Sequence, residues 1–124
     1  MAKALIVDDD PDLCELVAYK LERSGFAVRR ASNGDEAMSA VEEERPDVVI
    51  LDIMMPGLSG LDVLERWRGA PATAGLPVIL LTAKTREADV ERGFALGASD
   101  YITKPFSPRE LVGRVNAVLA RSVH

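Results

Sequence analysis

Carboxylate, hydroxyl and amine side chains follow the short apolar runs of this chain, where they could do chemistry together. Asp8 and Asp9 come directly after one run, and Asp52, Thr82 and Lys104 come after three later runs. If the runs are neighbouring strands of a parallel sheet, their carboxyl ends bring these groups into one crevice. The spacing therefore predicts a site with three acids, one hydroxyl and one ammonium group.

The three acids Asp8, Asp9 and Asp52 indicate a metal site. Crowded carboxylates raise one another's pKa and destabilise the fold unless a cation joins them. Mg²⁺ suits such a site, because it accepts a few carboxylates and keeps several waters. Lys104 cannot neutralise three acids by itself, so we expect it to hold an anion that arrives beside the metal.

The chemistry that such a site favours is the acceptance of a phosphoryl group by Asp52. Its carboxylate is already ionised and needs no general base, while a metal ion and Lys104 spread the charge of the phosphoryl oxygens. Thr82 offers a hydroxyl to the same group. Asp10 has a simpler interpretation, because it stands before Pro11 and suits the cap of a helix.

Composition excludes several other classes of protein. The 124 residues suffice for one domain, and we expect residues 1–124 to form a single one. A net charge of −5 disfavours direct binding of nucleic acid. With Cys14 as the one cysteine and the terminal His124 as the one histidine, Ser-His-Asp hydrolases, zinc enzymes and disulfide scaffolds are excluded. No signal peptide or membrane-length apolar run is visible, so we expect a cytoplasmic protein that does not enter membranes.

The elements that must position the site alternate between strands and helices. Short apolar runs predict buried strands at Ala4–Val7, Val48–Leu51 and Val78–Leu81, and weaker patterns predict strands nearer the sheet edges at Phe26–Arg30 and Asp100–Thr103. Amphipathic stretches with helix caps separate them. Helix starts are predicted at Asp10 with Pro11, Asn33 with Glu36 as a capping box, Ser59, Arg86 and Ser107 with Pro108, and helix ends near Gly25, Gly69 and Gly97. The alternation predicts an α/β fold of three layers, with a five-stranded parallel sheet between helices.

Four segments carry a resemblance to a known family. They are LIVDDDP, DVVILDIMMPGLSGLD, PVILLTA and GASDYITKPFSPRELVGRV, in this order. Over essentially its whole length the chain resembles the receiver domain of bacterial two-component response regulators. The resemblance implies the flavodoxin-like (βα)5 fold with strand order 2-1-3-4-5, of which the chemotaxis receiver protein is a well-known example.

The resemblance also implies a role for each acid. Asp52 is the phosphoacceptor, which takes a phosphoryl group from a phosphohistidine on a sensor histidine kinase or a histidine phosphotransfer protein. Asp9 binds Mg²⁺ directly and Asp8 mostly through water, and the backbone carbonyl of Met54 is a further ligand. Such a domain is a phosphorylated switch in signal transduction rather than an enzyme, although it assists its own phosphorylation and slow autodephosphorylation.

The remaining implied roles concern the switch. Thr82 bonds a phosphoryl oxygen, Lys104 pairs with the phosphoryl group, and Tyr101 turns inward as Thr82 moves. Pro105 follows a cis peptide bond. Tyr101 could equally be a half-buried aromatic of an edge strand, and Pro105 a strand terminator. Met54 and Lys84 hold variable positions of the family site and are expected to tune the lifetime of the phosphorylated state.

Two rivals share parts of this pattern. Haloacid-dehalogenase phosphatases need a second aspartate two residues after the nucleophile, where this chain has Met54. Flavodoxins bind a flavin phosphate with free N–H groups of a loop after the first strand, where this chain has repelling acids. Both are disfavoured.

The output is left open by the sequence. The chain could be a stand-alone regulator, or the receiver of a longer DNA-binding regulator, since segments such as PRELVGRV are common where an output domain follows. In either case the expected partner surface is the face of the fourth helix, fifth strand and fifth helix. A downstream effector, a tethered output domain or a second copy in a phosphorylation-dependent homodimer would dock there.

Overall fold

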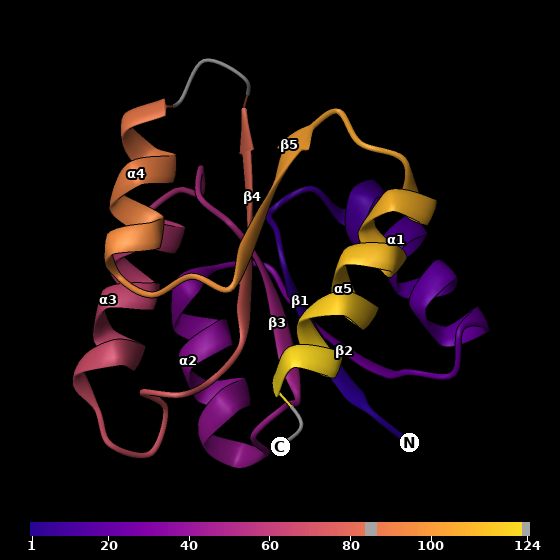
Figure 1. Ribbon diagram of the computed structural model, residues 1–124, viewed down its shortest axis with the longest axis horizontal. Coiled ribbons are helices and arrows are strands. Elements are labelled where there is room, and N and C mark those ends of the chain that lie inside the picture. The colour runs from indigo at the N-terminus through magenta and orange to yellow at the C-terminus, as the bar shows by residue number, and fades with distance from the viewer. Residues whose placement is uncertain (84–86, 123–124) are drawn as a thin grey trace.

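A parallel sheet forms the centre of the molecule, as the computed structural model shows for residues 1–83 and 87–122 (Figure 1). Its order is β2-β1-β3-β4-β5, with every neighbouring pair parallel. The five strands are β1 (Lys3–Val7), β2 (Ala27–Ala31), β3 (Val48–Asp52), β4 (Val78–Ala83) and β5 (Asp100–Lys104). The predicted fold class and strand order are confirmed.

Helices cover both faces of the sheet. They are α1 (Pro11–Arg23), α2 (Gly34–Glu43), α3 (Gly60–Gly69), α4 (Glu87–Ala95) and α5 (Pro108–Ser122). Figure 1 shows α1 and α5 together on one face and α2, α3 and α4 on the other. No helix in the part of the chain that the structure describes is long and apolar enough to cross a membrane.

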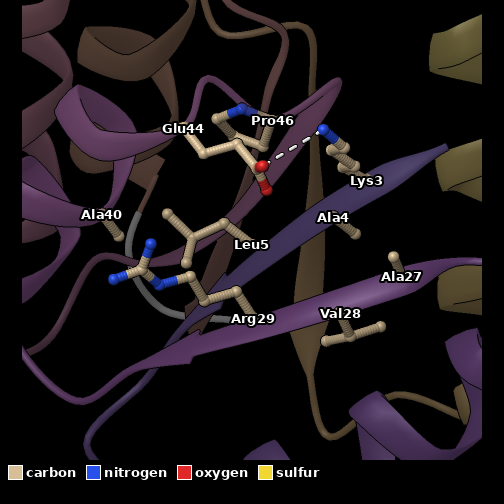
Figure 2. A pocket seen from close by; sticks show the side chains of 9 residues that line it. All are labelled: Lys3, Ala4, Leu5, Ala27, Val28, Arg29, Ala40, Glu44 and Pro46. Carbon is tan, nitrogen blue, oxygen red and sulfur yellow. Dashed lines mark ion pairs between the residues drawn. The ribbon is translucent and has the colours of Figure 1, made fainter.

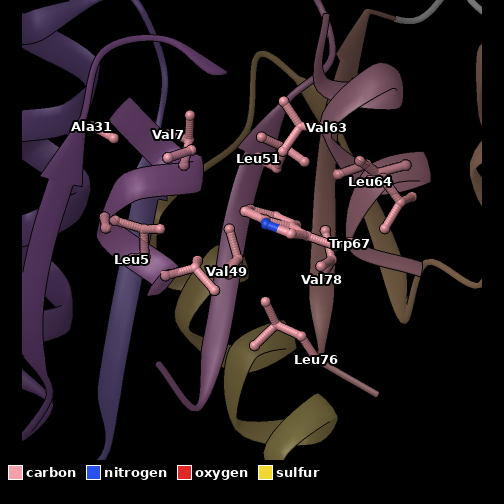
Figure 3. Packing of buried hydrophobic residues seen from close by; sticks show 14 of the residues in the cluster. Leu5, Val7, Ala31, Val49, Leu51, Val63, Leu64, Trp67, Leu76 and Val78 are labelled. Carbon is pink, nitrogen blue, oxygen red and sulfur yellow. The ribbon is translucent and has the colours of Figure 1, made fainter. Parts of the chain in front are cut away.

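Two apolar clusters lie between these layers, one on each face of the sheet. Successive side chains of a strand point to opposite faces, so Leu5 and Val7 enter the cluster under α2 and α3, whereas Ala4 and Ile6 enter the cluster under α1 and α5. Figure 3 shows the first cluster around Trp67 of α3. The predicted burial of these strands on both faces is confirmed, because the apolar residues of the predicted runs Ala4–Val7, Val48–Leu51 and Val78–Leu81 are all buried.

Helix caps mostly follow the predicted pattern. Asp10 caps α1, since its Oδ1 accepts hydrogen bonds from the N–H groups of Asp12 (3.0 Å) and Leu13 (3.3 Å). Ser59 caps α3 in a full capping box with Asp62, in which each side chain accepts from the other residue's backbone N–H. These caps fix where the helices begin, directly beyond the strand ends that carry the acids.

The structure corrects two details of the prediction, and a third lies beyond the residues that it describes. The capping box at Asn33 is only half formed, because the Glu36 carboxylate accepts from the backbone N–H of Ser32 (2.9 Å) instead of that of Asn33. β2 begins one residue late, since Phe26 turns into the core before the strand pairs with β1. The predicted start of the fourth helix at Arg86 lies outside the described residues, as do Lys84 and His124.

Candidate functional site

Three acids meet at the carboxyl ends of β1 and β3. Carboxylate oxygens of Asp8, Asp9 and Asp52 all lie within 4.8 Å of one another. The pairing of Val7 with Leu51 brings the next residues of the two strands together. Asp8 is 1% exposed and Asp52 is 3% exposed, whereas Asp9 faces solvent. The predicted convergence of the acids therefore results directly from the adjacency of β1 and β3.

Lys104 from β5 joins the two buried acids. Its Nζ lies 2.9 Å from Oδ2 of Asp8 and 3.4 Å from Oδ2 of Asp52. Burial alone lowers the pKa of Lys104, but the hydrogen bond to Asp8 and the charge of Asp52 outweigh it, so the pKa is raised. The side chain is therefore a cation at neutral pH, and the two acids hold it at the crevice.

The ionised form of Asp52 is destabilised at this position. Burial first, and then the charge of Asp8, raises the pKa of Asp52 from 3.8 to about 6. The charge of Lys104 and a hydrogen bond from the backbone N–H of Met54 (3.2 Å) oppose the shift without cancelling it. One ammonium group does not compensate the acids, which is the condition under which a further cation binds favourably.

The donor set fits Mg²⁺ in particular. All three candidate ligand side chains are carboxylates, and small hard cations prefer oxygen ligands. Asp9 is exposed and makes no ion pair among the described residues, so its oxygens are available. Asp10 is engaged as the α1 cap, which confirms the prediction that it caps a helix.

Gly60, at the start of α3, holds the backbone of Asp52 and was missed by sequence reasoning. Its N–H donates to the carbonyl of Ile53 (3.0 Å), and a Cβ at Gly60 would collide with the carbonyl group of Asp52. Only glycine lets α3 approach the candidate phosphoacceptor this closely. The glycine after PGLS in the sequence was a signal for this contact, but spacing alone does not say which backbone it touches.

Cys14 contributes a second contact that the sequence did not indicate. Its Sγ donates a hydrogen bond to the backbone carbonyl of Asp8 (3.3 Å). Burial, followed by the charge of Asp8, raises the pKa of Cys14 to about 11, so the thiol keeps its proton at neutral pH. We interpret Cys14 as a support for the loop that carries Asp8 and Asp9.

The other candidate residues lie around this group of acids. Thr82 is buried at the end of β4, where its hydroxyl donates to the carbonyl of Ala83 (3.3 Å). Tyr101 on the edge strand β5 is half-buried, and its ring meets Phe94 of α4 edge to face, with ring centroids 5.5 Å apart. Met54 exposes its side chain, and the peptide bond between Lys104 and Pro105 is cis.

A small cavity opens at the opposite end of the sheet and has different chemistry. Its volume is about 100 Å³, and an ion pair between Lys3 and Glu44 (3.2 Å) spans it (Figure 2). Aliphatic side chains such as Ala4, Leu5 and Val28 line the rest. With its charges already paired and little space, this cavity offers nothing comparable to the acidic crevice.

Comparison with known proteins agrees with this geometry. Residues 4–116 match the family model described as "Response regulator receiver domain". The alkaline phosphatase synthesis transcriptional regulatory protein PhoP of Bacillus subtilis is 48% identical over 97% of this chain and 49% of its own length. The DNA-binding response regulator MtrA of Mycolicibacterium smegmatis is 47% identical over 97% of this chain and 51% of its own. The chain thus spans about half the length of the curated relatives it matches.

Solved structures show the same fold. A putative response regulator from Chloroflexus aurantiacus superposes with a TM-score of 0.91 at 42% identity, covering 97% of this chain and 98% of that one. The chemotaxis protein CheY4 of Vibrio cholerae superposes with a TM-score of 0.89 at 32% identity, covering 95% and 98%.

Proposed function

We propose a function for this chain from the premise that it belongs to the response regulator receiver domain family, to which residues 4–116 match. Receiver domains are phosphoacceptor switches of two-component systems and not classical enzymes. In this chain we propose Asp52 as the phosphoacceptor, with a phosphohistidine of a sensor histidine kinase or histidine phosphotransfer protein as the donor. The observation that carries the proposal is the burial of Asp52 within reach of both the other acids and Lys104.

The proposed cofactor is Mg²⁺. Asp9 would bind it directly and Asp8 mostly through water, with Asp52 and the backbone carbonyl of Met54 as the remaining protein ligands. Bound Mg²⁺ would neutralise part of the charge of the acids and of the incoming phosphoryl group. The raised pKa of Asp52, caused first by burial and then by the charge of Asp8, supports this assignment, because a bound cation would stabilise the ionised carboxylate.

The transfer itself needs little from the protein beyond position and charge. A carboxylate oxygen of Asp52 forms the new bond to phosphorus as the bond from phosphorus to the donor's imidazole nitrogen breaks, and that nitrogen keeps the electron pair. Lys104, already at the crevice, turns from the acids to the phosphoryl oxygens. The Thr82 hydroxyl exchanges its bond to the Ala83 carbonyl for one to a phosphoryl oxygen. Later attack by water on phosphorus would reverse the modification slowly.

The switch that follows would act through α4 and β5. Phosphorylation adds roughly one to two negative charges at the crevice, which favour states in which Thr82 and Lys104 contact the phosphoryl group. Tyr101 would follow Thr82 inward and leave its edge-to-face contact with Phe94. The face of α4, β5 and α5 would then dock an effector, an output domain or a second copy of the chain.

The whole protein is proposed to be a cytoplasmic DNA-binding regulator of which residues 1–124 are the single receiver domain. The names of the relatives PhoP and MtrA, and the half of their length that this chain spans, favour this function. A stand-alone regulator is the second candidate, favoured by the matching chains from Chloroflexus aurantiacus and Vibrio cholerae, which this chain covers almost completely.

Phosphorylation by a small donor tests the central proposal. We expect acetyl phosphate with Mg²⁺ to add the mass of one phosphoryl group, measured on the intact protein. The gain should vanish in Asp52→Asn and when Mg²⁺ is chelated, whereas Asp10→Asn should keep it. An unmodified wild type, or a modified Asp52→Asn, contradicts the assignment.

A further inference from the structure

A groove between α2 and α3 lies outside the machinery described so far. It has a volume of about 390 Å³, within the usual size range of small-molecule sites. It opens where α2 and α3 end, and these helix ends lie at the edge of the sheet away from the acids (Figure 1). Its lining consists of Met38, Val41, Glu42, Arg45, Arg66, Trp67, Ala70, Ala72 and Thr73.

Trp67, which lines the groove, carries a hydrogen-bond donor that has no acceptor among the described residues. Trp67 is 3% exposed, and its ring packs among the side chains of the central cluster (Figure 3). Buried tryptophans normally find an acceptor for the indole N–H. Within residues 1–83 and 87–122 this N–H has no acceptor, yet no fully enclosed polar side-chain atom there lacks one. The N–H is therefore not fully enclosed by protein, and Trp67 is one of the residues that line the groove.

The rim adds positive charge. Arg45 and Arg66 are both exposed, and neither guanidinium forms an ion pair or hydrogen bond with another described residue. Glu42 is the one acid in the lining, so the groove carries a net charge of +1. The chain as a whole carries −5, which makes this local excess of unpaired guanidinium groups a feature of the groove.

Hydrogen bonds order the turn after α3, which forms one wall of the groove. The hydroxyl of Thr73 donates to the carbonyl of Trp67 (2.7 Å), and the N–H of Thr73 donates to that of Ala70 (3.1 Å). Arg68 then donates to the carbonyl of Thr73 (3.3 Å). These bonds fix the turn after α3, so a ligand need not pay the conformational entropy of ordering it.

We propose that this groove binds a small organic anion, with an apolar body against Met38, Val41 and Ala70 and a carboxylate toward the rim. The apolar walls bury the body, while Arg45 and Arg66 pair with the carboxylate and the Trp67 N–H supplies a hydrogen bond. The groove shares no residue with the acidic crevice, so binding needs neither Mg²⁺ nor phosphorylation.

Fluorescence provides a direct test, because Trp67 is the one tryptophan of the chain. The probe is 3-phenylpropionate, and its uncharged counterpart is 3-phenylpropan-1-ol. We expect the carboxylate to change Trp67 fluorescence saturably, to shift the indole N–H resonance, and to bind at least tenfold more tightly than the alcohol. No saturable change, or equal affinity of the two compounds, overturns the proposal.

Charge-removing variants locate the site. Arg66→Gln and Arg45→Gln should each weaken 3-phenylpropionate binding about fivefold. Arg109→Gln, which removes the same charge from an exposed position on α5, should change it less than twofold. All three positions are exposed, so the fold should survive, as circular dichroism can verify. If Arg109→Gln weakens binding as much as the other two, the effect is general electrostatics and the groove is not an anion site.

Discussion

Helices α3 and α4 cover the same face of the sheet with nearly equal lengths but very different anchorage. In α3, five residues are buried, namely Gly60, Leu61, Val63, Leu64 and Trp67. In α4, Gly93 is the one buried residue. A helix without buried side chains gains little hydrophobic stabilisation and opens at low free energy. The fold thus holds the backbone of Asp52 with a firmly packed helix and covers the neighbouring output face with a loosely packed one.

The contacts that retain α4 explain the difference. Gly93 lets the helix backbone approach Leu80 without a side chain between them. Beyond this, Arg92 forms ion pairs to Asp62 (3.9 Å) and Glu65 (3.5 Å), and all three side chains are about half exposed. Exposed ion pairs of this kind contribute about 0 to 1 kcal/mol. Movement of α4 therefore sacrifices few contacts, which suits it to the switch proposed above.

The largest expected effect comes from removing the anchor of α3. Trp67→Ala should lower the free energy of unfolding by about 3 to 5 kcal/mol, because it leaves a large cavity in the apolar cluster under α2 and α3. Phe94→Ala on α4 should lower it by less than about 1.5 kcal/mol, since this ring is half exposed. Urea denaturation followed by circular dichroism measures both. Equal losses would mean that α4 is anchored as firmly as α3.

The second prediction concerns the buried charge of Asp52, which destabilises the folded chain at neutral pH. The pKa of Asp52 is about 6 in the folded chain, against an ordinary value of 3.8 for this carboxyl group. The folded state therefore binds more protons between these values, and stability falls as pH rises from about 4 to 6. A shift of this size corresponds to about 2 to 3 kcal/mol lost at neutral pH.

Removing that charge should recover the loss. In metal-free protein at pH 7.5, Asp52→Asn should raise the free energy of unfolding by about 2 kcal/mol, and the gain should disappear below about pH 4. Mg²⁺ should stabilise the wild type and much less the variant. The matched control is Asp47→Asn, an exposed acid at the other end of the sheet. A gain that is independent of pH would assign the effect to packing instead.

Two glycines give the third and smaller test of the same contrast. At Gly60 an added Cβ meets the backbone of Asp52, which cannot move without disturbing the site, so Gly60→Ala should cost about 1 to 3 kcal/mol. At Gly93 the close contact is with the end of the Leu80 side chain rather than with backbone, and Leu61 lies at ordinary van der Waals distance. Alanine also favours the helix by about 0.5 to 1 kcal/mol, so Gly93→Ala should be nearly neutral in urea denaturation. If Gly93→Ala lowers the free energy of unfolding more than Gly60→Ala does, α4 is the more tightly packed helix and the comparison drawn above is wrong.

Sequence reasoning reached the site because its main determinants are local. A strand that is buried on both faces is visible as an apolar run, and the residue after it must emerge at the crevice, as Asp8 and Asp52 do. Contacts between separate elements were not visible in this way. The thiol bond from Cys14 to Asp8 and the approach of Gly60 to Asp52 depend on how helices sit against strands. The pattern of residues along the chain does not specify those distances.

The groove between α2 and α3 is another feature that the sequence pattern does not specify. The sequence shows Trp67 as an apolar residue at helical spacing, and the structure confirms its burial. That Trp67 lines one groove together with two unpaired arginines follows only from the packing of α2 beside α3. Likewise the half-formed capping box at Asn33 has the expected residue types and spacing, but Glu36 selects the neighbouring N–H of Ser32.

The smallest expected effect tests the loose helix at its one aromatic contact. Phe94 and Tyr101 meet edge to face, with centroids 5.5 Å apart and planes at 84°. Such pairs are worth about 0.5 to 1.5 kcal/mol beyond their buried area, so a double-mutant cycle of Phe94→Leu and Tyr101→Leu should give a coupling in this range. If phosphorylation of Asp52 turns Tyr101 inward, the coupling should fall toward zero in protein kept phosphorylated by excess acetyl phosphate and Mg²⁺. A coupling that persists unchanged would show that Tyr101 of β5 stays in contact with Phe94 of α4, and the switch would then have to leave this aromatic pair intact.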